Sequence, residues 1–92
     1  MIVRILGEGQ YRVPDAAADQ LNAIDDRLER AVRSTDGAAF AAELHALVAA
    51  VRAHGAPVPD DELMPSDAVV PDPDTSLAEA RRLLSDEGLI PD

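Results

Sequence analysis

The sequence predicts an α+β fold, in which a β-hairpin and a short third strand pack against helices. Three observations support this class. Two β-prone runs flank Gly7-Glu8-Gly9, two longer stretches repeat apolar residues at helical spacing, and a proline-rich segment precedes a last capped helix. Because a typical domain has about 100–150 residues, residues 1–92 are predicted to form a single domain.

Residues 1–13 are predicted to form the hairpin, with Gly7-Glu8-Gly9 as its loop and Arg4 opposite Arg12. Strand alternation then gives a core face of Val3, Ile5, Tyr11 and Val13. Directly opposed like charges are destabilising. We therefore expect the two arginines either to splay into water or to lie beneath an acidic side chain.

Residues 15–34 and 36–54 are predicted to form two helices that pack antiparallel, because the connection between them is short. The first places Leu21, Ile24, Leu28, Ala31 and Val32 on one face, and the second does so with Phe40, Leu44, Leu47, Val48 and Val51. Asp36 is placed to cap the second helix, and Gly55 to end it.

The second helix also has a face of small residues, formed by Ala38, Ala42, Ala46, Ala49 and Ala53. Two interpretations stay open. Small side chains allow close approach of a helix from a partner or from a second copy of the chain. Alternatively, alanine occurs here only because it is the best helix former.

Residues 56–75 are predicted to form an acidic strap, an extended segment lying over the core. They contain five of the seven prolines and six acidic residues, with no basic residue. Ala68-Val69-Val70 can add a third strand to the hairpin, which would be marginal with two. Ser76 and Glu79 form a capping-box pattern that opens a helix over residues 76–86.

The charge balance restricts the classes of partner. The chain has 18 acidic residues, eight arginines and no lysine, for a formal net charge of −10. Binding to nucleic acid or directly to an anionic membrane requires clustered basic residues, so neither is expected. No cysteine is present, and no apolar run is long enough to span a membrane, which predicts a cytoplasmic protein.

The sequence offers no convincing catalytic, cofactor or metal motif. The Asp72-Pro-Asp-Thr-Ser76 segment lacks the large parallel sheet and basic partner that phosphoryl chemistry needs. His45 and His54 are nine residues apart on one helix, so they lie about 180° apart and cannot share a metal ion. We therefore expect no enzymatic activity and no cofactor.

Three separated blocks resemble the PspA-associated (PspAA) domain family: Met1-Ile-Val-Arg-Ile-Leu-Gly-Glu-Gly-Gln-Tyr11, Asp60-Asp-Glu-Leu-Met-Pro-Ser-Asp67 and Leu84-Ser-Asp-Glu-Gly-Leu-Ile-Pro91. The resemblance implies a bacterial or archaeal adaptor or regulator. Its partner would be PspA, a coiled-coil, membrane-associated protein of the phage-shock envelope-stress response. Such a protein would reach the inner face of the membrane only through this partner.

The resemblance does not specify which residues bind, and from charge and exposure we take as candidate partner-binding residues Asp60, Asp61, Glu62, Asp67, Ala42, Ala49, Leu89, Ile90, Arg4 and Arg12. The strap and the Leu89-Ile90 end have a second interpretation, in which they close the domain's own core. Two alternative functions also stay open. The chain can be a self-associating module such as a homodimer, or a sensor of a small ligand or cation built on Asp60, Asp61 and Glu62.

Overall fold

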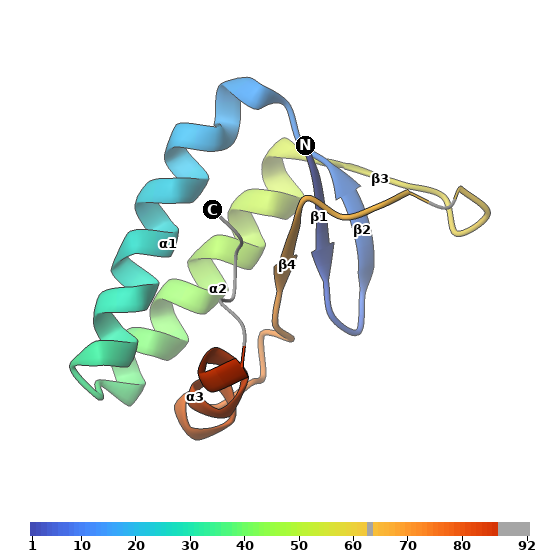
Figure 1. Ribbon diagram of the computed structural model, residues 1–92. Helices are drawn as coiled ribbons and strands as arrows, with labels where there is room; N and C mark the ends of the chain where they lie inside the picture. Colours follow the sequence, from blue (N-terminus) through green and yellow to red (C-terminus); the bar gives the residue numbers. More distant parts are fainter. Residues whose placement is uncertain (63, 87–92) are drawn as a thin grey trace.

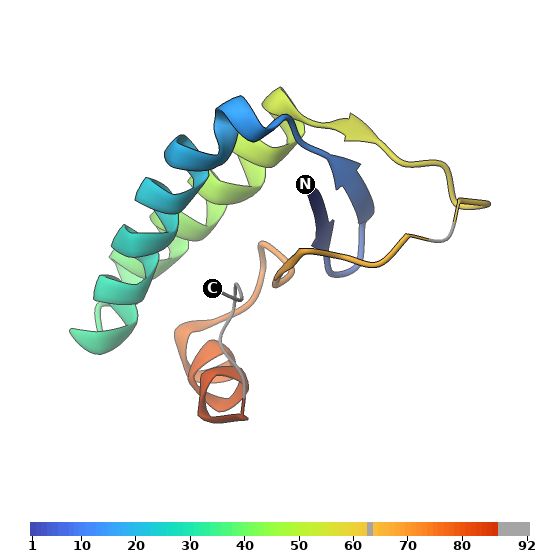
Figure 2. The ribbon, with the colours of Figure 1, turned by 45° about the horizontal axis from the view of Figure 1, so that its top comes forward.

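The computed structural model describes residues 1–62 and 64–86, with side chains described as far as residue 82. Within this part, four strands form one mixed sheet in the order β3-β2-β1-β4. Helices α1 and α2 pack side by side on one face of the sheet, whereas the segment between β3 and β4 extends away from the helices (Figures 1 and 2). The predicted α+β class is confirmed.

The hairpin consists of β1 (Ile2–Ile5) and β2 (Gly9–Arg12). The predicted register is wrong by two residues, because Tyr11 pairs with Val3, and Arg4 pairs with Gln10 instead of Arg12. A β-turn causes the shift: the Glu8 amide donates to the Ile5 carbonyl at 3.0 Å.

That turn also changes the role of the glycines. Gly7, with φ of +83°, occupies the position in the turn that requires a left-handed backbone, and Gly9 opens β2. A shift of two residues preserves the faces of a strand. The predicted core face is therefore correct, with Val3, Ile5 and Val13 buried and Tyr11 packed against the core.

Helices α1 (Ala18–Arg33) and α2 (Gly37–His54) supply most of the core. Every large apolar residue predicted for their inner faces is buried, with Leu28, Leu44 and Val51 fully enclosed. The Asp36 carboxylate accepts the Ala39 amide at 3.0 Å, which confirms the predicted cap. Before α1, Asp15–Ala17 form a 3-10 turn in which Asp15 makes no capping hydrogen bond.

Gly55 ends α2 as predicted, but without the left-handed backbone that a glycine at a helix C-terminus usually adopts. Its φ is −92°, so no left-handed backbone is involved. A Cβ at this position would lie 2.6 Å from the Val51 carbonyl oxygen and 3.0 Å from the Tyr11 Cβ. Gly55 is therefore required by the carbonyl at the end of α2 and by the close approach of β2.

The strap (residues 56–75) contributes both outer strands of the sheet. The predicted third strand is present as β4 (Ala68–Val70), which pairs parallel to β1. The two-residue β3 (Ala56–Pro57) was not predicted, because its pairing with β2 depends on residues about 45 positions away and leaves no local pattern. The strap thus forms both edges of the sheet.

The last helix, α3 (Leu77–Asp86), packs near the start of α2 (Figure 1). The predicted capping box is present, since the Glu79 amide donates to the Ser76 hydroxyl at 3.2 Å and the Glu79 carboxylate accepts from the Ser76 amide. Ala80 is fully buried and Leu77 packs against the core. The predicted inner residue Leu84 lies beyond the described side chains.

Candidate interaction surface

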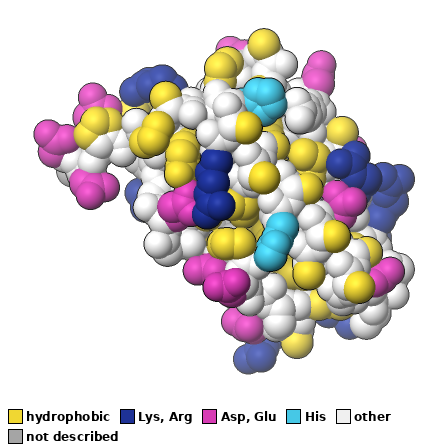
Figure 3. Space-filling model, turned by 180° about the vertical axis from the view of Figure 1, so that it is seen from behind, with side chains coloured by type: hydrophobic (Ala, Val, Ile, Leu, Met, Phe, Trp, Pro, Cys, Tyr) yellow, Lys and Arg dark blue, Asp and Glu magenta, His cyan; other side chains and the backbone are white. Residues whose placement is uncertain are grey.

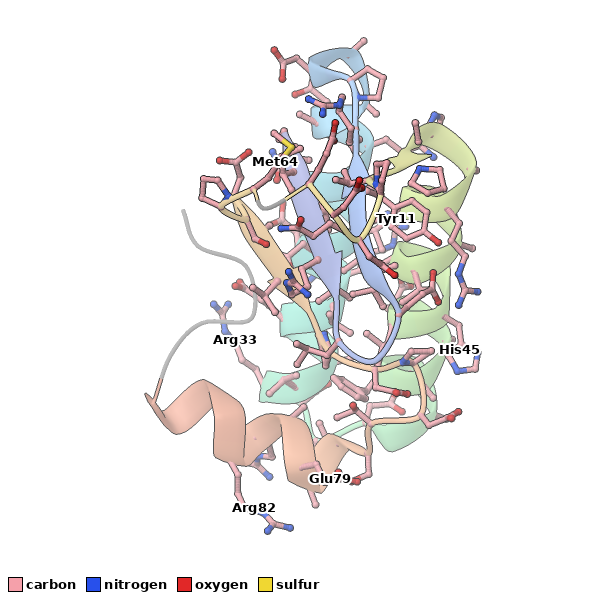
Figure 4. The ribbon with its side chains drawn as sticks, turned by 90° about the vertical axis from the view of Figure 1, so that its right-hand side faces the viewer. Tyr11, Arg33, His45, Met64, Glu79 and Arg82 are labelled. Atoms are coloured by element: carbon pink, nitrogen blue, oxygen red, sulfur yellow. The ribbon has the colours of Figure 1, made fainter. Side chains whose placement is uncertain are left out.

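The face of the sheet opposite the helices carries the most polar of the candidate residues. Strand alternation turns Ile2, Arg4, Gln10 and Arg12 to this side, and residues 58–66 of the strap pass over it. Figure 4 looks onto this face and shows Met64 of the strap in front of the strands. We call this surface, formed by the outer sheet face and residues 58–66, the strap face.

Gln10 holds the strap against the sheet. Its side-chain amide nitrogen donates to the Met64 carbonyl at 2.7 Å and to the Ser66 hydroxyl at 2.9 Å. Its own carbonyl accepts the Val58 amide at 2.9 Å. Gln10 is only 8% exposed and is the one polar residue that is buried in the described part of the chain. This role is not evident from the sequence, because a glutamine between Gly9 and Tyr11 forms no distinctive motif.

The two arginines of this face have different surroundings. Arg12 lies 3.7 Å from the Glu62 carboxylate and donates to the Met64 sulfur at 3.3 Å. The expectation that an acidic side chain meets the arginines therefore holds for Arg12. The Arg4 side chain is exposed and forms no hydrogen bond or ion pair with any residue that the structure describes.

A hollow of about 340 Å³ lies between the strap and the sheet. It is lined by Arg4, Gly9, Gln10, Val58, Pro59, Asp60, Glu62, Met64 and Pro65. The structure therefore brings four candidate residues, Arg4, Arg12, Asp60 and Glu62, to one side of the molecule. Charged groups of both signs line or border the hollow, beside an apolar wall from the strap.

Asp67, another candidate, has a structural role. Its carboxylate accepts the Ile2 amide at 2.7 Å, and its own amide donates to the Ile2 carbonyl at 2.8 Å. Both bonds fix the start of β4 against the start of β1. The Asp67 carboxylate is thus already engaged, unlike Asp60 and Asp61, which are exposed and have no partner among the described residues.

Among the described residues, the acidic side chains of the strap do not converge on a metal site. Within the described residues, no group of three or more histidine, aspartate or glutamate side chains is placed to hold a metal ion. Asp60, Asp61 and Glu62 therefore offer negative charge without converging ligands, and the cation-sensor alternative has no geometric support in this part of the chain.

Ala42 and Ala49 lie on the other side of the molecule, on the outward face of α2. Both are exposed, as are Ala38 and Ala53, whereas Ala46 is half-buried against the core. Figure 3 shows small hydrophobic side chains around and between the two histidines of this helix. This alanine face and the strap face belong to opposite layers, so they form two separate surfaces. Leu89 and Ile90 lie outside the described residues.

A cluster of Glu8, Tyr11 and Arg52 was not predicted. Arg52 donates through two nitrogens to the Glu8 carboxylate, and the Tyr11 hydroxyl donates to the same group. These hydrogen bonds, that of Arg52 first, lower the pKa of Glu8 to about 2. The bond to Glu8 also raises the pKa of Tyr11. The contact between Glu8 and Arg52 joins residues 44 positions apart, so no local sequence pattern predicts it.

Together, the two-layer fold and the mixed-charge strap face define a small acidic α+β protein with an open hollow on one side. The family model of the PspA-associated protein matches residues 1–92, so the chain belongs to this family. Neither the curated proteins nor the solved structures contain a significant match. Among the described helices, none is both long enough and apolar enough to cross a membrane.

Proposed function

We propose that this protein is a non-enzymatic adaptor or regulator that binds PspA in the phage-shock response to envelope stress. The observation that carries the proposal is the match of the whole chain to the PspA-associated family. Binding to PspA would bring the protein to the inner face of the membrane, although its own charge disfavours anionic lipid.

Electrostatics supports the strap face as the binding surface. Asp60 and Asp61 are exposed carboxylates without partners among the described residues, and they adjoin Glu62 in a protein of net charge −10. Such groups speed the encounter with a basic surface and orient it more than they add affinity. The proposal therefore includes a basic helical surface on PspA as the complement of the strap.

Calorimetric titration of purified PspA with this protein at several salt concentrations tests the proposal. We expect saturable binding that weakens as salt is raised, because salt screens exposed charges. The triple variant Asp60→Asn, Asp61→Asn, Glu62→Gln should bind more weakly and with a smaller salt dependence. If the unaltered protein does not bind PspA, the proposal is refuted.

A matched variant separates local from overall charge. Asp19→Asn, Asp26→Asn and Asp74→Asn also remove three exposed negative charges, but from positions outside residues 58–66. We expect this variant to keep most of the affinity. Equal loss in both triple variants would show that only net charge matters, and would count against residues 58–66 as the contact.

Self-association is the second candidate function, favoured by the exposed alanine face of α2. Ala38, Ala42, Ala49 and Ala53 are small and exposed and allow close approach of a second helix, with the exposed His45 and Arg52 on the same side of α2. Light scattering of the protein alone over a range of concentrations distinguishes the two functions. A stable dimer that does not bind PspA would favour this candidate.

A further inference from the structure

We propose that the hollow beneath the strap receives a carboxylate side chain of PspA, bound by Arg4, while a basic residue beside that carboxylate contacts Asp60. This inference rests on the proposed function and specifies the chemistry of the partner. The occupant is an acidic side chain on a helical surface that is otherwise basic.

Arg4 supplies the cationic end of the site. It lines the hollow, it is exposed, and it has no partner among the described residues, although the chain contains 18 acidic residues. Its neighbour on the strap face, Arg12, is by contrast already occupied by Glu62. A guanidinium group binds a carboxylate through two parallel hydrogen bonds, so Arg4 has the geometry to hold one.

Gln10 adds a hydrogen-bond acceptor beside Arg4. The two residues are direct cross-strand partners, and both line the hollow. The Met64 carbonyl can only accept, so the Gln10 amide nitrogen must point toward the strap. Both hydrogens of that nitrogen have partners in Met64 and Ser66, and the Gln10 Oε1 has none among the described residues.

The Gln10 Oε1 is not among the buried side-chain atoms that lack a partner in the described part of the chain, so it is open to solvent or to a ligand group. The Gln10 Oε1 thus offers an acceptor for an N–H group, next to an arginine that offers donors for a carboxylate. A polypeptide supplies both kinds of group within a short distance. The hollow is polar on its sheet side, and the apolar wall of Val58, Pro59 and Met64 can pack the aliphatic stem of a glutamate.

Size and charge favour a side chain of a protein over a free anion. The volume of about 340 Å³ lies near the lower end of ligand sites, which span about 300–1,000 Å³. Asp60 lines the hollow and Asp61 follows it, so a free anion approaching Arg4 meets repulsion from both. A carboxylate that has basic neighbours is instead attracted twice: Arg4 attracts the carboxylate, and Asp60 and Asp61 attract the basic neighbours.

Substitution of Arg4 tests the inference, with calorimetric titration against full-length PspA as the readout. Arg4→Gln should weaken binding by about tenfold or more, the loss typical of a charged contact at the centre of an interface. Arg4→Lys keeps the positive charge but loses the two parallel N–H donors of the guanidinium group. Its affinity for PspA should lie between that of Arg4→Gln and that of the unaltered protein. Arg30→Gln, which removes an exposed arginine from α1, is the matched control and should bind normally.

The outcomes separate this inference from the proposed function. If the unaltered protein does not bind PspA, both fail. If it binds and Arg4→Gln binds equally well, the inference fails and the proposed function stands. Arg4 is exposed, so thermal unfolding of Arg4→Gln should match that of the unaltered protein and show that the fold is intact.

Competition with free N-acetylglutamate distinguishes a protein side chain from a small ligand. We expect millimolar N-acetylglutamate to leave PspA binding unchanged, because it lacks the basic neighbours that Asp60 requires. Displacement of PspA from the unaltered protein, but not from Arg4→Gln, would identify the hollow as a site for a free carboxylate and overturn the choice of occupant.

Discussion

Glu8 in the hairpin turn and Arg52 in the last turn of α2 form a two-pronged salt bridge. The Arg52 Nε donates to one carboxylate oxygen of Glu8 at 3.0 Å, while its Nη2 donates to the other. The Tyr11 hydroxyl donates a hydrogen bond to the same carboxylate, from three residues further along the chain. The bridge ties the turn of the hairpin to the helix layer and holds the two layers in place.

This bridge predicts a pH-dependent contribution to stability. The pKa of Glu8 falls from 4.5 to about 2 on folding, chiefly through the hydrogen bond from Arg52. A carboxylate with a lowered pKa stabilises the fold above its unfolded pKa, and the effect disappears as pH falls through the folded value. Glu8→Gln should therefore lower the melting temperature at neutral pH, and the difference from the unaltered protein should shrink between pH 4.5 and pH 2.

Thermal unfolding at a series of pH values measures this difference. Glu29→Gln is the control, because Glu29 forms a more exposed pair with Arg33 at 3.5 Å along α1. Exposed helix pairs contribute little, so the control should change the melting temperature only slightly. A Glu8→Gln difference that stays constant as pH falls would contradict the lowered pKa.

Gly55 should not tolerate alanine, although its backbone angle would accept one. The added Cβ would lie 2.6 Å from the Val51 carbonyl oxygen, so the end of α2 or β2 must shift. Overpacking of this kind costs about 1–3 kcal/mol. Gly37→Ala is the matched control, since a Cβ there meets nothing within 4 Å and alanine favours the helix. Urea unfolding of both variants tests the contrast, and an equal effect would refute it.

Asp67 should matter more for stability than its exposure suggests. In Asp67→Ala the Ile2 amide loses its 2.7 Å hydrogen bond, and an unpaired buried amide costs about 1–3 kcal/mol. Asp61→Ala removes a neighbouring acid with no such partner and should change the free energy of unfolding by less than about 0.5 kcal/mol. Urea unfolding measures both values. Similar stability of the two variants would mean that the β1–β4 junction does not need this carboxylate.

Adjacent alanines on α2 should respond oppositely to a charged residue. Ala50 is buried in the core and Ala49 is exposed on the alanine face. Ala50→Glu should unfold the protein or destabilise it by several kcal/mol, about the cost of burying an unpaired charge, whereas Ala49→Glu should leave the fold intact. Circular dichroism with thermal unfolding compares them. Two equally damaging variants would show that the alanine face is covered.

Much of the fold could be predicted because its signals are local. The helical repeats that contain Leu28 and Leu44 identified the buried faces, and the Asp36 cap and the Ser76–Glu79 box identified where α2 and α3 begin. Each of these features depends on residues a few positions apart. The short strand at Ala68–Val70 was recognised from its β-branched residues and from the need of a hairpin for a further strand.

The candidate surface was predicted only in part. Arg4, Asp60 and Glu62 were all proposed as contacts, and they line the same hollow. Asp67 is acidic like Asp60 and Glu62, but its hydrogen bonds to Ile2 show a structural role. A sequence shows the type of a side chain, whereas its availability depends on which backbone groups lie beside it.

The sequence by itself determined the three helices, the hairpin and β4, the inward and outward faces of these elements, and the acidic character of the strap, because short-range periodicity and composition set them. Only the tertiary structure decided the register of the hairpin, the pairing of β3 with β2, and the Glu8–Arg52 bridge. It also decided that Gln10 is buried while Arg4 stays unpaired beside it. These features depend on contacts between residues far apart in the chain, which form only when the layers pack and which no local pattern encodes.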